Sequence, residues 1–567
     1  MRRVPLVVVG LLALASCGSD GHDTSPASTT PNTLLVVSGT DPAGTTAAAP
    51  TTTAPATTVR VTAPPTTAES AATTTSSPYL AYRGADWIEA ENARTGTDAW
   101  KIVPKQLFVP DSIDGYANTT SALIGDTVSL HVASLASTTF TVEAYRMGFY
   151  GGLQGRLVWT SEPTTTAPPS DPAIDPVTHM AEADWPVSLR VPITSEWPPG
   201  TYLLKLVSAI GAESYVPLTI RDDDSSADLV AIDAVTTWQA YNDWGSCSLY
   251  QCLMDDETPR STVVSFDRPI FGFFGHGAAD YLDHELPLIS LAEERGLDIT
   301  YITDIDLDQR PGLVLHHRAV LSLGHDEYYS TAMYDALESA RDRGVNLAFL
   351  GANAVYRRIR LEPGADGTPA RRMVNYRSVK DPATKSDPKD ATVDWRDAPL
   401  LRPEITLIGI MYECAASGSM TIVDPENWVF AGTHVRKGAV MRGLIGSEYD
   451  RVYPGRGAPK NLEVLSHSFI PCRGRPSYAN SSYYSAPSGA GVFATGTIKW
   501  VCAIDATCTK APVPAFVRQV TINVLEAFAA GPAGSAHPSK PNPRVIVRPP
   551  TPTTIPGAST TTTTRPA

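Results

Sequence analysis

The chain has 567 residues, a formal net charge of −14 and 48 prolines. Its length allows two or three ordinary domains, but the prolines and the threonine-rich ends indicate that part of the chain builds no core. The acidic balance, without any clustered run of arginine and lysine, excludes nucleic acid as a partner.

The first seventeen residues have the pattern of an export signal. Two arginines precede an apolar stretch, Val4 to Ala15, that is too short to span a membrane. The tetrapeptide that ends at Cys17 resembles a bacterial lipobox. We therefore expect residues 1–17 to be a lipoprotein signal peptide, with a lipid on Cys17 that anchors the protein to the outer face of the cell membrane. Ordinary secretion with cleavage after small residues is the alternative.

Both ends of the remaining chain lack apolar periodicity. Residues 18–78 consist almost entirely of Thr, Ala, Pro and Ser, and residues 532–567 have the same character. Such segments cannot bury enough apolar surface to offset chain entropy. We expect residues 18–78 to form a disordered stalk and residues 532–567 to form a disordered tail.

Residues 85–222 alternate apolar and polar side chains in short runs separated by turn residues. This pattern predicts an immunoglobulin-like β-sandwich. The expected strands are Thr127–Ala133, Thr139–Tyr145, Val187–Val191 and Tyr202–Val207.

Residues 227–531 alternate strand and helix signals, which predicts a doubly wound α/β domain with a parallel sheet of the flavodoxin or amidotransferase type. The clearest unit is a strand at Ala319–Leu323, a helix marked by Met333 and Leu337, and a strand at Val345–Leu350. Such a crossover requires parallel strands. Further strands are expected at Leu229–Thr237, Ile299–Ile302, Glu404–Met411, Trp428–Ala431, Val440–Ile445 and Gly491–Thr497, and helices at Glu285–Arg295, Gln309–His317 and Phe516–Phe528.

Six cysteines follow position 17. An even number in an exported chain suggests disulfides. The close spacing of Cys247 with Cys252, and of Cys502 with Cys508, favours local bridges, which would leave Cys414 to pair with Cys472, although the spacing alone does not fix the connectivity. A zinc site is disfavoured because no two Cys-x2-Cys pairs occur.

Polar side chains follow the expected ends of four strands. Because the carboxyl ends of parallel strands meet at one edge of a sheet, we expect these side chains to share one rim. Carboxylate, imidazole and phenol can hold a hard transition ion, and phenolate oxygen favours Fe(III), which would activate water for hydrolysis. The set comprises Trp238, Tyr241, Asn242, Asp304, Asp306, His325, Asp326, Glu327, Tyr328, Asn353 and Tyr356.

Each acid in this set also has a structural interpretation. Asp304 and Asp306 could cap the helix that follows them, and Glu327 or Asp326 could lie in a first helical turn, where the helix dipole favours an acid. Glu448, after the strand at Val440–Ile445, is either a base that acts through water or a partner for Arg451. A nucleophile elbow is excluded because Gly324 is followed by His, Asp and Glu rather than by a hydroxyl or thiol.

Several blocks of sequence resemble the C-terminal domain of the large (beta) subunit of N,N-dimethylformamidase. The resemblance covers most of residues 85–531. The blocks are Trp238–Gly245, Asp298–Leu307, His317–Tyr328, Gly344–Ala354 and Arg371–Val374, and Tyr145–Gly152 resembles the β-sandwich segment that precedes that domain.

This resemblance implies an amidohydrolase with one iron ion held by two tyrosines and one glutamate. Glu327 would be the carboxylate ligand, Tyr241 a phenolate ligand, and His325 the neighbour of the reacting water. Relatives carry Arg-Pro-Tyr where this chain has Arg-Pro-Ile270. If that tyrosine is the second ligand in relatives, the nearest substitute here is Tyr250.

We therefore expect a surface-tethered, iron-dependent hydrolase of amide or other C–N bonds. His325 or Glu448 would manage the proton and Asn353 would orient a small amide-like substrate, which need not be dimethylformamide. The alternative is a non-catalytic protein of the cell envelope that recognises a wall component through a degenerate metal site. The sequence predicts no oligomeric state.

Overall fold

The computed structural model describes residues 77–103, 113–135, 137–168, 170–253, 260–272 and 274–544. The predicted signal peptide, Cys17, residues 18–76 of the predicted stalk and residues 545–567 of the predicted tail lie outside these ranges. From Pro78 onward the described residues belong to one compact unit. None of the helices in this described part is long and apolar enough to cross a membrane.

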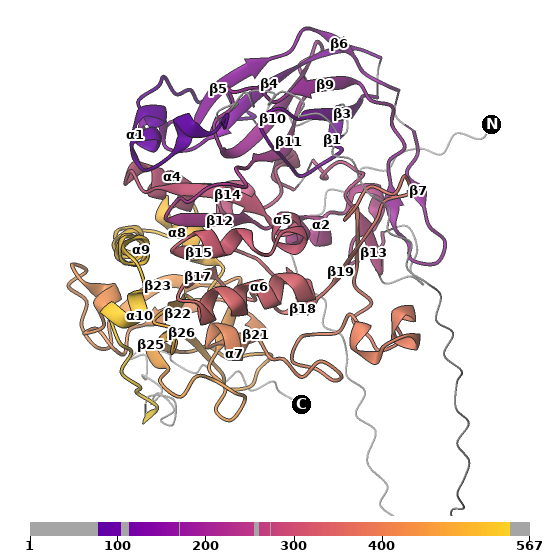
Figure 1. Ribbon diagram of the computed structural model, residues 1–567. Coiled ribbons are helices and arrows are strands. Elements are labelled where there is room, and N and C mark those ends of the chain that lie inside the picture. The colour runs from indigo at the N-terminus through magenta and orange to yellow at the C-terminus, as the bar shows by residue number, and fades with distance from the viewer. Residues whose placement is uncertain are drawn as a thin grey trace, which may run out of the picture. The chain divides into compact units, whose positions relative to one another are not determined.

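Two sheets in residues 113–220 enclose one apolar core (Figure 1). Alternate residues such as Leu130 and Val142 point into that core and are fully buried, which is the pattern of a sheet with one buried face. The first sheet has the order β1 (Asp114–Ala117), β3 (Thr127–Ala133), β9 (Leu189–Pro192). The second has the order β2 (Ser121–Ala122), β11 (Glu213–Ile220), β10 (Gly200–Ser208), β4 (Thr139–Met147), β5 (Gly155–Thr160), with β6 (Thr164–Thr165) beside β4.

All four predicted strands of this segment form, as β3, β4, β9 and β10. Every pairing in the two sheets is antiparallel except that of β2 with β11. The immunoglobulin-like type stays a prediction.

A seven-stranded sheet forms the centre of the rest of the chain. Its order is β14 (Ile299–Thr303), β12 (Leu229–Asp233), β15 (Ala319–Gly324), β17 (Asn346–Gly351), β27 (Gly491–Ala494), β26 (Tyr478–Ser485), β25 (Glu463–Phe469). The first five strands are parallel, whereas β26 pairs antiparallel with both of its neighbours, β27 and β25. The sheet is thus mixed rather than wholly parallel, because a short connection joins β25 to β26. The serine-rich sequence of β26 gives no apolar signal, so these two strands were not predicted.

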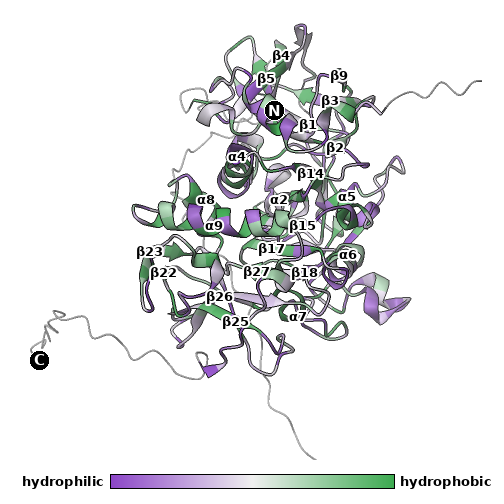
Figure 2. Cartoon of the chain, turned by 60° about the vertical axis from the view of Figure 1, so that its left-hand side comes forward, coloured by the Kyte–Doolittle hydropathy of each residue, from purple (hydrophilic) through white to green (hydrophobic). Residues whose placement is uncertain are grey.

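Helices cover both faces of this sheet, as Figures 1 and 2 show. One face packs on α4 (Leu286–Glu294), α8 (Lys499–Ile504) and α9 (Val513–Ala530), and the other on α5 (Asp304–Gln309) and α6 (Thr331–Asp342). The central strands are buried on both sides, as continuous apolar runs require. The flavodoxin or amidotransferase type stays a prediction.

Smaller elements surround these layers. The helices are α1 (Asp86–Asn92), α2 (Val235–Tyr241), α3 (Tyr281–His284), α7 (Ile405–Ile408) and α10 (Ala533–Ala536). The strands are β7 (Ala173–Ile174), β8 (Ala181–Glu182), β13 (Val263–Ser265), β16 (Tyr328–Tyr329), β18 (Arg357–Arg358), β19 (Arg360–Glu362), β20 (Arg372–Val374), β21 (Met411–Ala415), β22 (Gly418–Thr421), β23 (Val440–Ile445) and β24 (Glu448–Arg451).

Some predicted elements were wrong. The strand predicted at Leu229–Thr237 ends at Asp233, and α2 follows it. The strand predicted at Glu404–Met411 is mostly the helix α7, and that at Trp428–Ala431 is the 3-10 helix η9 (Trp428–Phe430). Short buried helices and strands share the same apolar composition, so periodicity does not separate them.

Two further predictions need correction. The helix predicted at Gln309–His317 is divided between the end of α5 and the 3-10 helix η6 (Leu313–His316). The ordered chain also continues past residue 531, because α10 packs on the sheet and the Asn542 side chain hydrogen-bonds both backbone groups of Val464 at the edge of β25.

Residues 113–220 have an apolar core of their own, but a second apolar cluster crosses the predicted boundary near residue 222. A buried ion pair joins Arg146 of β4 to Glu293 of α4 with 2.6 Å between nitrogen and oxygen. Tyr145 and Met147 of β4 belong to the same apolar cluster as Leu288 and Leu291 of α4. The two predicted domains therefore pack against each other through continuous apolar contact.

Candidate functional site

The site lies where β15 and β17 end. The carbonyl of Gly324 approaches Gly351 so closely that a Cβ on Gly351 would lie 1.5 Å from its oxygen. Gly324 also has φ +54, in the left-handed region that favours glycine. Two glycines are thus needed for the turn that carries His325 and Glu327 to this edge.

One carboxylate oxygen accepts hydrogen bonds from two phenols. The Tyr241 hydroxyl lies 2.9 Å from Oε2 of Glu327, and the Tyr250 hydroxyl lies 2.7 Å from the same atom. The two rings stack with 4.1 Å between their centroids. We call Tyr241, Tyr250 and Glu327 the phenol–carboxylate cluster.

A histidine and a second carboxylate lie beside this cluster. Nε2 of His325 is 3.4 Å from Glu327 Oε2 and 3.7 Å from Glu448 Oε2. The Asn353 side-chain amide donates to Glu448 Oε2 at 2.8 Å. Arg451, which was the alternative partner for Glu448, forms an ion pair with Glu413 at 3.4 Å. All six residues predicted as metal ligands or catalytic groups thus lie together, and the Tyr412 hydroxyl is 3.4 Å from Glu448 Oε1.

Cations hold Glu327 in its charged form. Burial by itself raises the pKa of this carboxyl, but the hydrogen bond and charge of His325, with Arg357, outweigh it and lower the pKa to about 2. Burial lowers the pKa of His325, but Glu327, Glu448 and Asp280 outweigh it and raise that pKa to about 9. Burial and the nearby Glu327 charge raise the pKa of both phenols well above 10. Burial also raises the pKa of Glu448.

The donor set fits a hard metal ion. Within the described ranges no three His, Cys, Asp or Glu side chains are placed to hold a metal, so a metal here would depend on the phenol oxygens. Two phenols and a carboxylate that converge on one point are the oxygen donors that a trivalent ion such as Fe(III) prefers. Such an ion would replace the two phenol protons that now lie between the tyrosines and Glu327.

Other members of the predicted rim have structural roles. Asp304 and Asp306 lie in the first turn of α5, and Asp306 forms a capping box with Thr303. Asp304 accepts hydrogen bonds from Thr236, and Asp326 accepts them from Ser322 and Tyr329. The capping alternative is therefore correct for Asp306, whereas the Asp304 side chain bonds Thr236 of α2 instead of capping α5.

Sequence reasoning missed several polar residues around the cluster. Arg357 Nε lies 3.3 Å from the second oxygen of Glu327. Arg377 donates to the Tyr328 hydroxyl, which in turn donates to the Tyr250 hydroxyl. Asp280 lies 3.9 Å from Nδ1 of His325. Arg357 directly follows the predicted rim residue Tyr356, but no motif distinguishes it from any surface arginine.

Three disulfides form, and their partners are those that spacing favoured: Cys247–Cys252, Cys414–Cys472 and Cys502–Cys508. The first closes a short loop that carries Tyr250. The second phenol is thus fixed by a covalent ring of six residues.

Comparisons with known proteins bear on this site. Residues 141–511 match the family described as N,N-dimethylformamidase beta subunit-like, C-terminal. No curated protein matches the chain. Among solved structures, a Paenibacillus sp. cycloisomaltooligosaccharide glucanotransferase complexed with cycloisomaltoheptaose is 9% identical over 34% of this chain and 27% of that chain, with a TM-score of 0.15. So slight a likeness supports no inference about fold or substrate. The family match spans more than half of the chain, and the protein belongs to the N,N-dimethylformamidase beta subunit-like family.

Proposed function

We propose that this protein is a surface-tethered, iron-dependent hydrolase of amide or other C–N bonds. Membership of its family indicates a hydrolase-like function. The observation that supports the metal is the convergence of the Tyr241 and Tyr250 hydroxyls on one oxygen of Glu327. These three residues would hold the ion, and a bound Fe(III) would supply Lewis-acid polarisation of an amide carbonyl.

His325 and Glu448 are suited to move protons in such a reaction. Hydrolysis of an amide requires a base that takes a proton from water and an acid that protonates the leaving nitrogen. The His325 ring nitrogen and the Glu448 carboxylate are 3.7 Å apart, so a small movement allows a proton to pass between them. Glu448 takes the proton from water, and His325 delivers one to the leaving nitrogen.

Asn353 is suited to hold both Glu448 and the substrate. Its amide nitrogen donates to Glu448, which fixes the carboxylate beside His325. Its side-chain oxygen is buried without a hydrogen-bond partner among the described residues. This oxygen is available to accept a hydrogen bond from the N–H of a small amide.

The tether is inferred from residues outside the described ranges, namely Leu14 to Cys17. Three disulfides support export, because such bonds persist in oxidising compartments. A binding protein with a degenerate site is disfavoured, because Tyr250 supplies a second phenol although position 270 is isoleucine.

The test uses the full-length chain, loaded with Fe(III), and a panel of small formamides and acetamides. We expect bound iron and release of amine or ammonia, with Glu448→Gln retaining the iron and losing turnover by about 100-fold or more. Iron binding without turnover on any amide would favour the binding-protein alternative. A folded protein that takes up no iron would overturn the metal site.

A further inference from the structure

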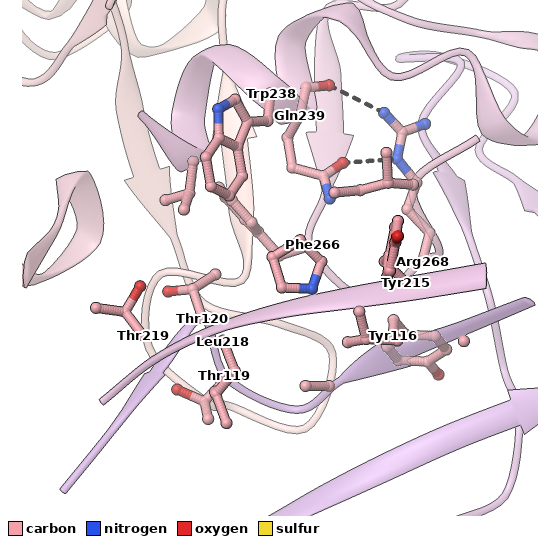
Figure 3. Close-up of a pocket in the computed structure, with 16 residues that line it drawn as sticks. Tyr116, Thr119, Thr120, Tyr215, Leu218, Thr219, Trp238, Gln239, Phe266 and Arg268 are labelled. Atoms are coloured by element: carbon pink, nitrogen blue, oxygen red, sulfur yellow. Dashed lines mark hydrogen bonds between the residues drawn. The ribbon is translucent and has the colours of Figure 1, made fainter. Parts of the chain in front are cut away.

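Arg268 is buried and forms hydrogen bonds to one short segment of the chain, residues 239–253. The side chain is 1% exposed. Its guanidinium donates five hydrogen bonds, at 2.9 to 3.2 Å, to the Gln239 side-chain oxygen and to the backbone oxygens of Gln239, Asn242, Trp244 and Cys247. Figure 3 shows the two bonds to Gln239.

This segment carries both phenols of the cluster. Tyr241 lies between the carbonyls of Gln239 and Asn242, and Tyr250 follows Cys247 by three residues inside the disulfide ring. We call residues 239–253 the phenol segment. Carbonyls at the end of α2 have no partner within the helix, and a cation there is favoured by the helix dipole. Arg268 thus supplies donors to a segment that has little regular structure of its own.

A pocket of about 50 Å³ lies beside Arg268. It is lined by Arg268 and Gln239 together with Trp238, Ile270 and residues of β1 and β11. Figure 3 shows this pocket between α2 and the strands. Of the phenol segment only Gln239 lines it, so the pocket leaves the hydrogen bonds of Arg268 to the other residues of the segment in place.

The electrostatics of Arg268 are unusual for a buried arginine. Within the described ranges all of its hydrogen-bond acceptors are neutral oxygens, and burial lowers its pKa to about 9. Arg146, equally buried, forms an ion pair with Glu293. The acceptors around Arg268 are thus amide and backbone dipoles of one segment instead of a carboxylate. Removing the guanidinium would leave those buried oxygens without this donor, so we expect its loss to affect that segment first.

We propose that Arg268 is a positioning residue that holds Tyr241 and Tyr250 against Glu327 before any metal binds. The positioning role is argued from the five hydrogen bonds of Arg268. That the positioned phenols capture Fe(III) rests on the proposed function. The planar guanidinium is required, because a lysine ammonium cannot reach oxygens on both sides of the segment in one fixed geometry.

The experiment uses the full-length chain, freed of metal by a chelator and labelled with 3-fluorotyrosine. Fluorine NMR resonances of the two phenols are assigned with Tyr241→Phe and Tyr250→Phe. The test variants are Arg268→Lys and Arg268→Met, and the matched control is Arg146→Lys. We expect both phenol resonances to shift or broaden beyond their linewidths in the Arg268 variants and to stay in place in Arg146→Lys, even though that control also loses stability.

A second measurement follows Fe(III) affinity, which we expect to fall by about tenfold or more in Arg268→Lys. Unchanged phenol resonances in a folded Arg268 variant would overturn the proposal, and Arg268→Lys decides if Arg268→Met does not fold. A wild-type protein that binds no iron would contradict the proposed function alone, because the fluorine resonances of the metal-free protein still report on Arg268.

Discussion

Buried carboxyl groups lie near both ends of α2, and their pKa values are shifted in opposite directions. At the C-terminal end, beside Tyr241, the pKa of Glu327 is lowered to about 2 because His325 and Arg357 outweigh the effect of burial. Next to the N-terminal end, Asp233 and Glu285 hydrogen-bond each other, and burial raises the pKa of Asp233 to about 6 and that of Glu285 well above its usual range.

This difference shows that burial alone does not identify a functional acid. Burial penalises the charged form at both places, and the cations within reach decide the outcome. Asp233 accepts hydrogen bonds from Thr201 and Thr219, but no cation hydrogen-bonds either acid of the pair among the described residues. A proton shared between the two carboxyls completes such a pair. Glu327 keeps its charge and is thus the group suited to a metal ion.

The largest expected effect comes from neutralising Glu327. In Glu327→Gln we expect iron affinity to fall by about 100-fold or more, or about 3 kcal/mol, because the charged ligand is lost. The matched control is Glu285→Gln, which replaces a carboxyl whose pKa is raised by burial and should retain iron. Metal titration of both variants checks this. Equal iron affinity in the two variants would contradict the claim that Glu327, and not Glu285, is the carboxylate that binds iron.

The next effect concerns the phenols. We expect Tyr241→Phe and Tyr250→Phe each to lower iron affinity by about tenfold to 100-fold, because each loses one oxygen ligand. Tyr329→Phe is the control, since that buried hydroxyl donates to Asp326 instead of Glu327. Iron titration followed by visible absorption of the phenolate–iron pair measures the effect. If Tyr250→Phe kept the wild-type iron affinity, a residue other than Tyr250 would have to supply the second ligand.

A smaller effect is expected in the dependence of stability on pH. The folded pKa of Asp233, about 6, lies above the ordinary value near 4, so the folded chain retains a proton that the unfolded chain releases. The stability that this provides is complete below about pH 4 and is lost as pH rises through about 6. The shift corresponds to about 3 kcal/mol.

Urea unfolding at pH 4, 6 and 8 tests this loss. We expect the free energy of unfolding of the wild type to fall by at least about 3 kcal/mol more over this range than that of the double variant Asp233→Asn/Glu285→Gln, because the raised pKa of Glu285 adds to that of Asp233. Parallel curves for the two proteins would show that the pair shares no proton.

The smallest effect is expected at Ile270. Since Tyr250 already supplies the second phenol, Ile270→Tyr should leave the number of iron ions bound per chain unchanged, with an affinity within about threefold of wild type. Elemental analysis and iron titration of the variant check this. A large gain in affinity would mean that the wild-type cluster lacks a ligand, as the degenerate-site alternative requires.

Much of the parallel core of the sheet could be predicted from sequence. The run Ala319–Leu323 and the helix around Met333 and Leu337 have the apolar pattern and glycine endings of a strand–helix–strand unit, and they form as β15 and α6. The antiparallel strand β26 could not be predicted, because its residues are mostly serine, asparagine and tyrosine.

The candidate site was predicted in its membership but not in its local structure. Tyr241 was expected after a strand and is instead the last residue of α2, because the strand ends four residues earlier than its apolar run. Spacing favoured the disulfide that encloses Tyr250, but nothing in the sequence indicated that Arg268 donates a hydrogen bond to the carbonyl of Cys247, 21 residues away. Tertiary contacts of this kind leave no periodic signal in the sequence.

The most direct test of the central claim is the visible absorption spectrum and iron content of the full-length protein after loading with Fe(III). The account predicts about one iron per chain and an absorption band from phenolate-to-iron charge transfer that disappears in the double variant Tyr241→Phe/Tyr250→Phe. A folded protein without iron, or a band that survives in the double variant, would contradict it.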